Sequence, residues 1–262
     1  MEREAKIMVL DTIYRNPTVK QVIFQITFPN LFYLEKRIGD IQEQIMREFP
    51  ESRLLLKNRI WITDTGPEQK IEIPSDEMEK NASRKIWQFE SRNKTILSIA
   101  LNSLDISSEF YKTYKLGDDE SKKFRHAIEY AVGNFLQIIK LPTINRIGLR
   151  YIDQCPLPHK DNETLTSWYN SKFPLNKFNI ADATSMTFRT IVKRGGYNLG
   201  YVESLQQING ENKLVLDFDG FAMDIDASDY LAVTDDLHDM ISKEYAATIR
   251  EPVFDYMNRQ ED

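Results

Sequence analysis

The sequence predicts an α+β fold made of two halves that follow the same element order, β-α-β-β-β-α. Extended segments in which apolar and polar residues alternate recur in both halves. Long segments with apolar residues three or four positions apart indicate amphipathic helices in both halves as well. Leu141-Pro142 closes one of these helices and divides the chain into residues 1–142 and 143–262.

The first half opens with an alternating strand over residues 19–28, which ends at Pro29-Asn30. An amphipathic helix is predicted over residues 31–49, because apolar side chains recur at alternating steps of three and four as far as Pro50. The remaining elements of this half are three strands and a second helix, predicted over residues 54–63, 85–91, 95–107 and 119–140.

The second half follows the same order. Its elements are a strand, a short helix, three strands and a long helix, predicted over residues 144–154, 165–173, 186–193, 197–207, 213–221 and from about 233 onward. Gly195-Gly196 supplies the positive φ of a tight hairpin turn, and Asn209-Gly210 marks the next turn. Pro252 is expected to break or kink the last helix and to leave a terminal turn.

We expect the two halves to pair edge to edge into one continuous, curved and mainly antiparallel sheet with helices on one face. TATA-binding-protein-like and helix-grip architectures have this arrangement. The halves share negligible sequence identity, so the duplication rests on element order and pattern alone. A string as common as β-α-β-β-β-α also arises without shared ancestry, and that alternative stays open.

Composition and charge narrow the classes of function. Basic residues number 34 and acidic residues 40, and the net charge of −6 gives no general attraction to phosphate backbones or anionic lipid. Cys155 is the single cysteine, which excludes an internal disulfide and a Cys-based zinc site. No apolar run approaches the roughly 20 residues needed to cross a bilayer, and the N-terminus lacks an apolar leader. We expect a cytoplasmic protein without a membrane partner.

The most unusual segment is Arg146-Ile-Gly-Leu-Arg-Tyr-Ile-Asp153. Because side chains alternate along a strand, Arg146 and Arg150 share one face and flank a glycine. The same alternation turns Asp217 and Asp219 of the predicted strand 213–221 outward. Two interpretations follow: the basic and the acidic strand neutralise each other across the sheet, or the four residues form a polar binding site on its uncovered side.

Catalytic signatures are mostly missing from the sequence. The histidines, His126, His159 and His238, form no two-His metal motif, and each is expected at the surface or in a helix cap. Asp217 and Asp219 lack a third carboxylate at a convincing spacing for magnesium. We therefore expect no catalytic residue, no metal and no cofactor.

A second group of candidate binding residues surrounds the predicted hairpin turn. Arg189, Lys193 and Arg194 supply cations. Together with Arg146, Arg150, Tyr197 and Tyr201 they form a candidate nucleic-acid patch. Arg189, Lys193 and Tyr197 are expected on one face of the hairpin. The acidic total weighs against nucleic acid, and a turn with two exposed cations explains the residues before Gly195-Gly196 as well as a phosphate cradle does.

Several of these segments together resemble a sporadically distributed prokaryotic family of uncharacterised proteins. The resemblance is carried by the segment 146–153, by Leu214-Val-Leu-Asp-Phe-Asp, by Phe49-Pro50 and by the ending Leu237-His238…Tyr245…Ile249. It spans most of the chain in order. Asp153 stands where that family usually has Asn, and the Pro252 region also departs from it. The resemblance implies no established activity, and the family's patchy distribution points by association to mobile or phage-defence genes.

The sequence thus favours a non-enzymatic binding or adaptor protein, acting as the sensor or regulatory partner of an effector protein encoded nearby. Two other classes stay open. One is a ligand-binding protein or enzyme with its site at Arg146, Arg150, Asp217 and Asp219. The other is a nucleic-acid-binding protein that uses the cations and tyrosines of the candidate nucleic-acid patch.

Overall fold

The structure is a computed structural model that describes residues 9–57, 84–115 and 123–259. Within these ranges, nine strands form one open antiparallel sheet. They are β1 (Val19–Thr27), β2 (Glu51–Lys57), β3 (Arg84–Glu90), β4 (Ile96–Ala100), β5 (Ser103–Ser108), β6 (Thr143–Pro156), β7 (Met186–Arg194), β8 (Tyr197–Ile208) and β9 (Glu211–Asp226). The helices are α1 (Leu34–Ile45), α3 (Phe124–Ile138), α4 (Asn162–Trp168), α5 (Tyr230–Thr248) and α6 (Glu251–Asn258), with short 3-10 turns η1 (Val9–Asp11), η2 (Ile180–Asp182) and η3 (Ala227–Asp229).

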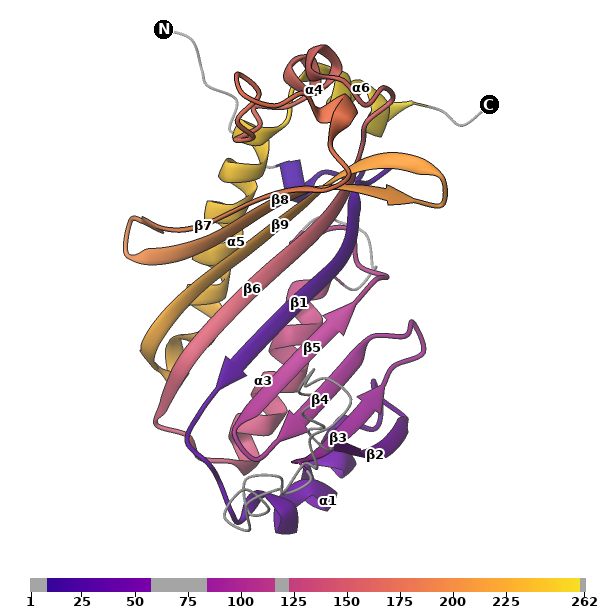
Figure 1. Ribbon diagram of the computed structural model, residues 1–262. Helices are drawn as coiled ribbons and strands as arrows, with labels where there is room; N and C mark the ends of the chain where they lie inside the picture. Colours follow the sequence, from indigo (N-terminus) through magenta and orange to yellow (C-terminus); the bar gives the residue numbers. More distant parts are fainter. Residues whose placement is uncertain (1–8, 58–83, 116–122, 260–262) are drawn as a thin grey trace, which may run out of the picture.

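The strands follow the order β2-β3-β4-β5-β1-β6-β9-β8-β7 across the sheet (Figure 1). In each half the first strand pairs with the last strand of the meander, β1 with β5 and β6 with β9. β1 and β6 then pair antiparallel at the centre, where Val22 lies opposite Tyr151 and Phe24 opposite Leu149. Strands from both halves therefore belong to one sheet, and the predicted α+β class with a mainly antiparallel sheet is confirmed.

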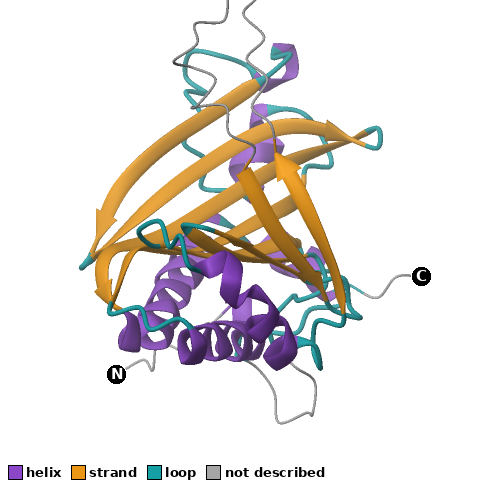
Figure 2. Ribbon diagram, turned by 90° about the horizontal axis from the view of Figure 1, so that it is seen from below, coloured by secondary structure: helices purple, strands orange, loops and turns teal. Residues whose placement is uncertain are grey.

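Helices α1, α3 and α5 gather on one side of the curved sheet (Figure 2). Their apolar stripes are buried, as Ile41 of α1, Phe135 of α3 and Ile241 of α5 illustrate. On the central strands every second residue points into the same core, for example Ile147 and Leu149, which are fully buried. The other strand residues point away from these helices and form the opposite face.

Helices α4 and α6 pack together at one end of the sheet (Figure 1). A backbone hydrogen bond of 2.9 Å from Arg250 N to Trp168 O joins the two segments. The terminal turn predicted after Pro252 is in fact this helix, α6. Pro252 lies in its first turn, where the missing N–H has no helical partner to lose.

The first half has one strand more than predicted, because residues 95–107 contain two strands rather than one. A two-residue turn at 101–102 joins β4 and β5. Buried residues fall at odd positions before the turn, such as Leu97, and at even positions after it, such as Leu104. This change of phase in the alternation marks the turn, although neither Gly nor Pro is present there.

Two predicted elements extend past the described residues. The strand predicted over 54–63 is described as β2, and its residues 58–63 lie outside the described part of the chain. The helix predicted over 119–140 is α3, and residues 119–122 lie outside as well. Among the helices of the described ranges, none is long and apolar enough to span a bilayer.

Candidate functional site

The four residues that the sequence places on the polar sides of two strands meet on the uncovered face of the sheet. Arg150 of β6 donates from Nε and Nη2 to the two carboxylate oxygens of Asp217 of β9, at 2.7 and 2.5 Å. Arg146 Nη2 lies 3.0 and 2.9 Å from the carboxylate oxygens of Asp219. We call the face that carries these residues, opposite α1, α3 and α5, the open face.

Both ion pairs run diagonally between β6 and β9. Arg150 is directly opposite Asp219 in the strand register, yet it binds Asp217. Arg146 reaches Asp219 by lying across Gly148, where a Cβ built on the glycine would stand 2.5 Å from Nη1 of Arg146. The glycine between the two arginines therefore leaves the space that the Arg146 guanidinium occupies.

Hydrogen bonds extend this row of polar side chains into the first half of the sheet. Arg146 Nη1 donates to Gln25 Oε1 at 3.3 Å, and Gln25 Nε2 in turn donates to Asp105 Oδ1. Farther along, Gln88 Nε2 donates to Ser98 Oγ at 3.1 Å. The sequence pattern alone does not predict these hydrogen-bond partners. The polar alternation of strand 19–28 was the available signal for Gln25.

The basic and acidic strands neutralise each other, which is one of the two interpretations that the sequence left open. The hydrogen bond to Asp217 is the main cause that raises the pKa of Arg150; burial opposes it, and the charges of Asp217 and Asp219 add to it. Each guanidinium is thus held by a carboxylate. The centre of the open face is polar but close to neutral.

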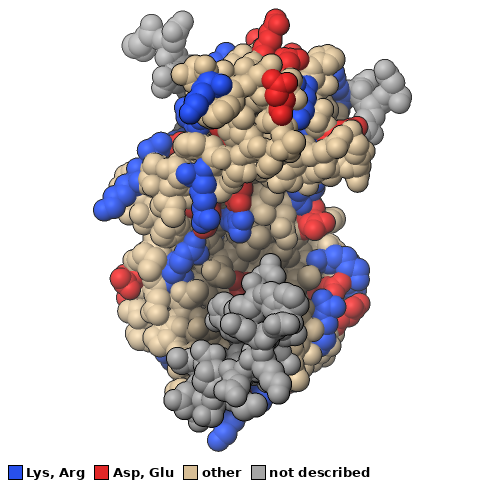
Figure 3. Space-filling view, in the orientation of Figure 1, with Lys and Arg blue, Asp and Glu red and all other residues tan. Residues whose placement is uncertain are grey.

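Free cations lie farther out on the same face, on the last strand of the sheet. Arg189 and Lys193 of β7 are exposed, and neither has an ion-pair partner among the described residues. Ile191 lies between them and is 60% exposed. Figure 3 shows basic side chains over the β7–β8 hairpin, whereas basic and acidic side chains lie side by side at the centre of the face.

Other members of the predicted hairpin patch lie on the helix-covered side. Arg194 Nε is 2.5 Å from Glu244 Oε1 of α5, and the Tyr197 hydroxyl donates to Asp236 Oδ2 at 2.7 Å. The expectation that Arg189, Lys193 and Tyr197 share one face is therefore wrong, because the two-residue turn places Tyr197 opposite Arg194. Tyr201, unlike Arg194 and Tyr197, is buried.

His238 is neither a surface residue nor a cap, and that expectation is also wrong. It is fully buried on α5, where Nδ1 lies 3.0 Å from the Tyr151 hydroxyl and Nε2 lies 3.1 Å from Asp11 Oδ2. Burial alone would raise the pKa of Asp11, but the contact and charge of His238 lower it. His126 and His159 are exposed, as expected.

Asp153 is a second buried acid of the interior. Its Oδ1 accepts a hydrogen bond of 2.9 Å from Thr18 Oγ1, which lies 2.6 Å from the Tyr245 hydroxyl. Its Oδ2 has no hydrogen-bond partner among the described residues. Burial raises the pKa of Asp153 to about 7. The side chain points toward the helices, so it belongs to the core and not to the open face.

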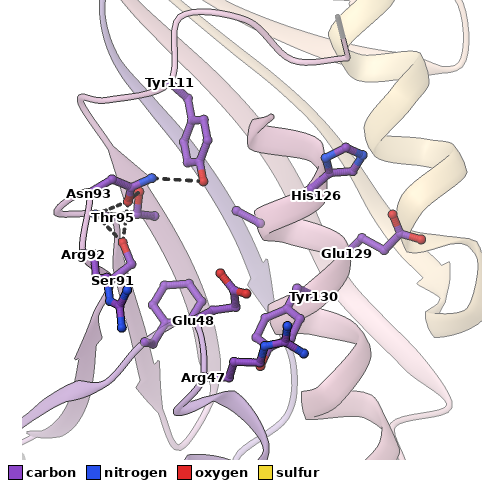
Figure 4. Close-up of a pocket in the computed structure, with 12 residues that line it drawn as sticks. Arg47, Glu48, Ser91, Arg92, Asn93, Thr95, Tyr111, His126, Glu129 and Tyr130 are labelled. Carbon is purple, nitrogen blue, oxygen red and sulfur yellow. Dashed lines mark hydrogen bonds between the residues drawn. The ribbon is translucent and has the colours of Figure 1, made fainter. Parts of the chain in front are cut away.

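A cavity of about 800 Å³ lies between the end of α1, the β3–β4 turn and the start of α3 (Figure 4). The Tyr111 hydroxyl points into it and accepts a hydrogen bond of 3.2 Å from Asn93 Nδ2, while His126 lies on the opposite wall. The charged residues of the lining carry both signs and are Arg47, Arg92, Glu48 and Glu129. Because both signs are present, the lining of the cavity favours neither an anionic nor a cationic ligand.

Within the described ranges, no group of three or more His, Cys, Asp or Glu side chains is arranged to hold a metal ion. No protein-family model, curated protein or solved structure matches the chain. The chemistry of the open face is therefore the basis for the function proposed below.

Proposed function

We propose that this protein is a non-enzymatic binding or adaptor protein that recognises a partner protein through the open face at β7. The observation that carries the proposal is the row formed by Arg189, Ile191 and Lys193, in which an exposed apolar side chain lies between two cations without ion-pair partners among the described residues. Such a row suits a partner surface that offers acidic and apolar groups together.

The neutral centre of the open face supports the same choice of site. Arg146 and Arg150 are held by carboxylates, so an anionic group would have to displace an existing ion pair to bind there. Arg189 and Lys193 need no such displacement. Binding at β7 therefore retains the full attraction between the cations and an acidic partner.

We further propose that the partner is an effector encoded nearby and that this protein acts in the cytoplasm as its sensor or regulator. The support is the resemblance carried by the segment 146–153, which points to mobile or phage-defence genes.

We also propose a duplicated, TATA-binding-protein-like arrangement of the two halves. The support is that β1 and β6, the first strands, both pair with the last strand of their own meander.

Nucleic acid is the second candidate partner, and the free cations of β7 favour it. Tyr197 and Tyr201, the aromatic residues expected to stack on bases, lie on the helix-covered side of the sheet. A nucleic-acid protein of this kind would bind DNA or RNA at low salt with an affinity that falls steeply as salt rises. Retention on heparin at low salt, followed by a salt titration, distinguishes this candidate from protein binding.

Site-specific photocrosslinking in native cells tests the proposal. A photoreactive residue in place of Thr187, exposed on β7, should capture one defined protein, which should then bind the purified full chain. The matched control places the same residue at Gln137, which is exposed on α3 on the other side of the molecule. Capture of the same proteins from both positions, or of none from Thr187, would reject the proposal, and crosslinked nucleic acid would favour the second candidate.

A further inference from the structure

Strand β7 has a free edge. It pairs with β8 on one side and forms the end of the sheet among the described residues. The hairpin turn has two central residues, with φ of +58° at Gly195 and no positive φ at Gly196, as in a type II′ turn. Arg194 and Tyr197 therefore close the hairpin as a hydrogen-bonded pair.

The turn fixes which backbone groups of β7 face outward. Because hydrogen-bonded and non-hydrogen-bonded pairs alternate along an antiparallel ladder, every second residue counted back from Lys193 directs its N–H and C=O away from β8. These residues are Thr187, Arg189, Ile191 and Lys193, and all four are exposed. Their side chains lie on the open face, so the outward backbone groups and the free cations belong to the same residues. Of these backbone groups, the C=O of Lys193 accepts a hydrogen bond of 3.4 Å from Arg194 Nη1, which an added strand would replace.

The side chains of β7 that face the core hold this strand in position. Phe188 and Val192 alternate with the exposed residues and pack against the core as half-buried side chains. Phe188 also contacts Tyr201 of β8, with ring centroids 6.3 Å apart. An added strand would therefore meet a strand that is already held by packing and by its ladder to β8.

Charge decides which strand can pair with this edge. A second copy of β7 aligned antiparallel about Ile191 would set Arg189 opposite Lys193, and a parallel copy in register would set each cation opposite itself. Like charges directly opposite each other destabilise a strand pair. The edge therefore resists self-pairing, as exposed edges of monomeric proteins commonly do, but it attracts a strand with acidic residues at those positions.

We propose that β7 is a docking strand for an extended acidic segment of a partner protein, with the pattern acidic-x-apolar-x-acidic. In this pairing the two acidic residues lie opposite Arg189 and Lys193, and the apolar residue lies opposite Ile191. Main-chain hydrogen bonds supply the affinity and the three open-face side chains supply the selectivity. This inference rests on the proposed binding function and specifies its partner.

A synthetic peptide provides the direct test. The probe is the end-capped peptide Thr-Thr-Asp-Thr-Val-Thr-Asp-Thr-Thr, which presents its acidic residues correctly in either strand direction. Titration into the full chain, followed by amide NMR, should shift the outward amides of Arg189, Ile191 and Lys193. The control peptide with Lys in place of both Asp residues should bind about tenfold more weakly, because two attractive pairs become repulsive.

Variants of the protein separate charge from backbone pairing. Arg189→Glu combined with Lys193→Glu should reverse the preference, so that the Lys peptide binds more tightly than the Asp peptide. Ile191→Pro removes one outward N–H and leaves the ladder to β8 intact, so it should abolish peptide binding, whereas Ile191→Val should retain it. Amide spectra outside β7 establish that each variant is folded.

The outcomes distinguish this inference from the proposed function. Equal binding of the two peptides, or no shift of the outward amides at millimolar peptide, overturns the docking strand. If a crosslinked partner binds the Glu double variant as tightly as the wild type, the docking strand is wrong while the binding function stands. If selective peptide binding occurs but no partner is captured from cells, the binding function fails instead.

Discussion

Arg146 lies across Gly148, so that a Cβ built on the glycine would stand 2.5 Å from Nη1 of the arginine. A methyl group there pushes aside the far end of a flexible side chain and leaves the backbone unstrained. The Gly148→Ala variant should therefore stay within about 1 kcal/mol of the wild-type stability but lose the ion pair with Asp219. A double-mutant cycle between Arg146 and Asp219, run with and without the Gly148→Ala change, measures the loss.

Gly39 of α1 provides the matched control for this variant. A Cβ at Gly39 would have no atom of the described residues within 4 Å, so Gly39→Ala should raise the free energy of unfolding by roughly 0.5–1 kcal/mol. It should leave the coupling between Arg146 and Asp219 unchanged. An equally strong coupling in the Gly148→Ala background would contradict the role assigned to the glycine.

Removing Arg150 tests whether its ion pair is structural. Its side chain is 43% exposed, so the pair contributes modestly, whereas Asp217 is only 17% exposed and would lose both hydrogen bonds. Arg150→Ala should lower the free energy of unfolding by about 1 kcal/mol, or the melting temperature by a few degrees.

Arg189→Ala is the control for Arg150→Ala, because Arg189 has no ion-pair partner among the described residues. Its melting temperature should match that of the wild type in a thermal unfolding experiment. If Arg150→Ala left the melting temperature unchanged but abolished binding of a ligand or partner, the polar-site alternative at the centre of the open face would gain support.

The alternation of apolar and polar residues along the strands allowed most of the fold to be predicted from the sequence. It predicted that Leu149 and Phe218 face the core and that Arg150 and Asp217 face away from it, and the burial of these residues agrees. It failed at residues 101–102, where a turn without Gly or Pro joins β4 and β5. The only sequence signal of such a turn is a shift in the alternation of apolar and polar residues. Two strands separated by such a shift are easily mistaken for one longer strand.

The candidate site was harder to predict from the sequence. Near a turn, a shift of one residue in the register decides which face of the sheet a side chain occupies. Arg194 lies one residue after Lys193 in the sequence but points to the helices and binds Glu244. His238 was misjudged because of its acidic neighbours, although it lies three residues before Ile241 on the buried stripe of α5. The free edge of β7 could not be predicted at all, since the strand order depends on tertiary pairing.

The hairpin turn gives a matched pair of glycine substitutions. Gly195 has a φ of +58°, a conformation that disfavours residues with a Cβ, whereas Gly196 does not have a positive φ. Gly195→Ala should therefore lower the free energy of unfolding by roughly 1 kcal/mol, and Gly196→Ala should change it by a few tenths at most. Denaturant unfolding of both variants checks the difference, and equal effects would contradict the type II′ turn.

Asp153 is a buried carboxyl group that accepts a single hydrogen bond among the described residues, from Thr18 to Oδ1. Burial raises its pKa from the ordinary 3.8 to about 7 in the folded protein. The folded state therefore binds a proton that the unfolded state releases between about pH 4 and pH 7. By linkage, the contribution of this group to stability is greatest below pH 4 and falls as the pH rises toward 7.

An Asp153→Asn variant should remove this pH dependence, because an amide fits the same place without ionising. The shift from 3.8 to about 7 corresponds to roughly 4 kcal/mol, so the variant should be more stable than the wild type at pH 8 by up to about that amount. Below pH 4 the two should have similar stabilities. Urea unfolding across this range measures the difference, and Asp105→Asn on the open face controls for the loss of one negative charge. A constant difference from pH 4 to pH 8 would show that Asp153 does not titrate in this window.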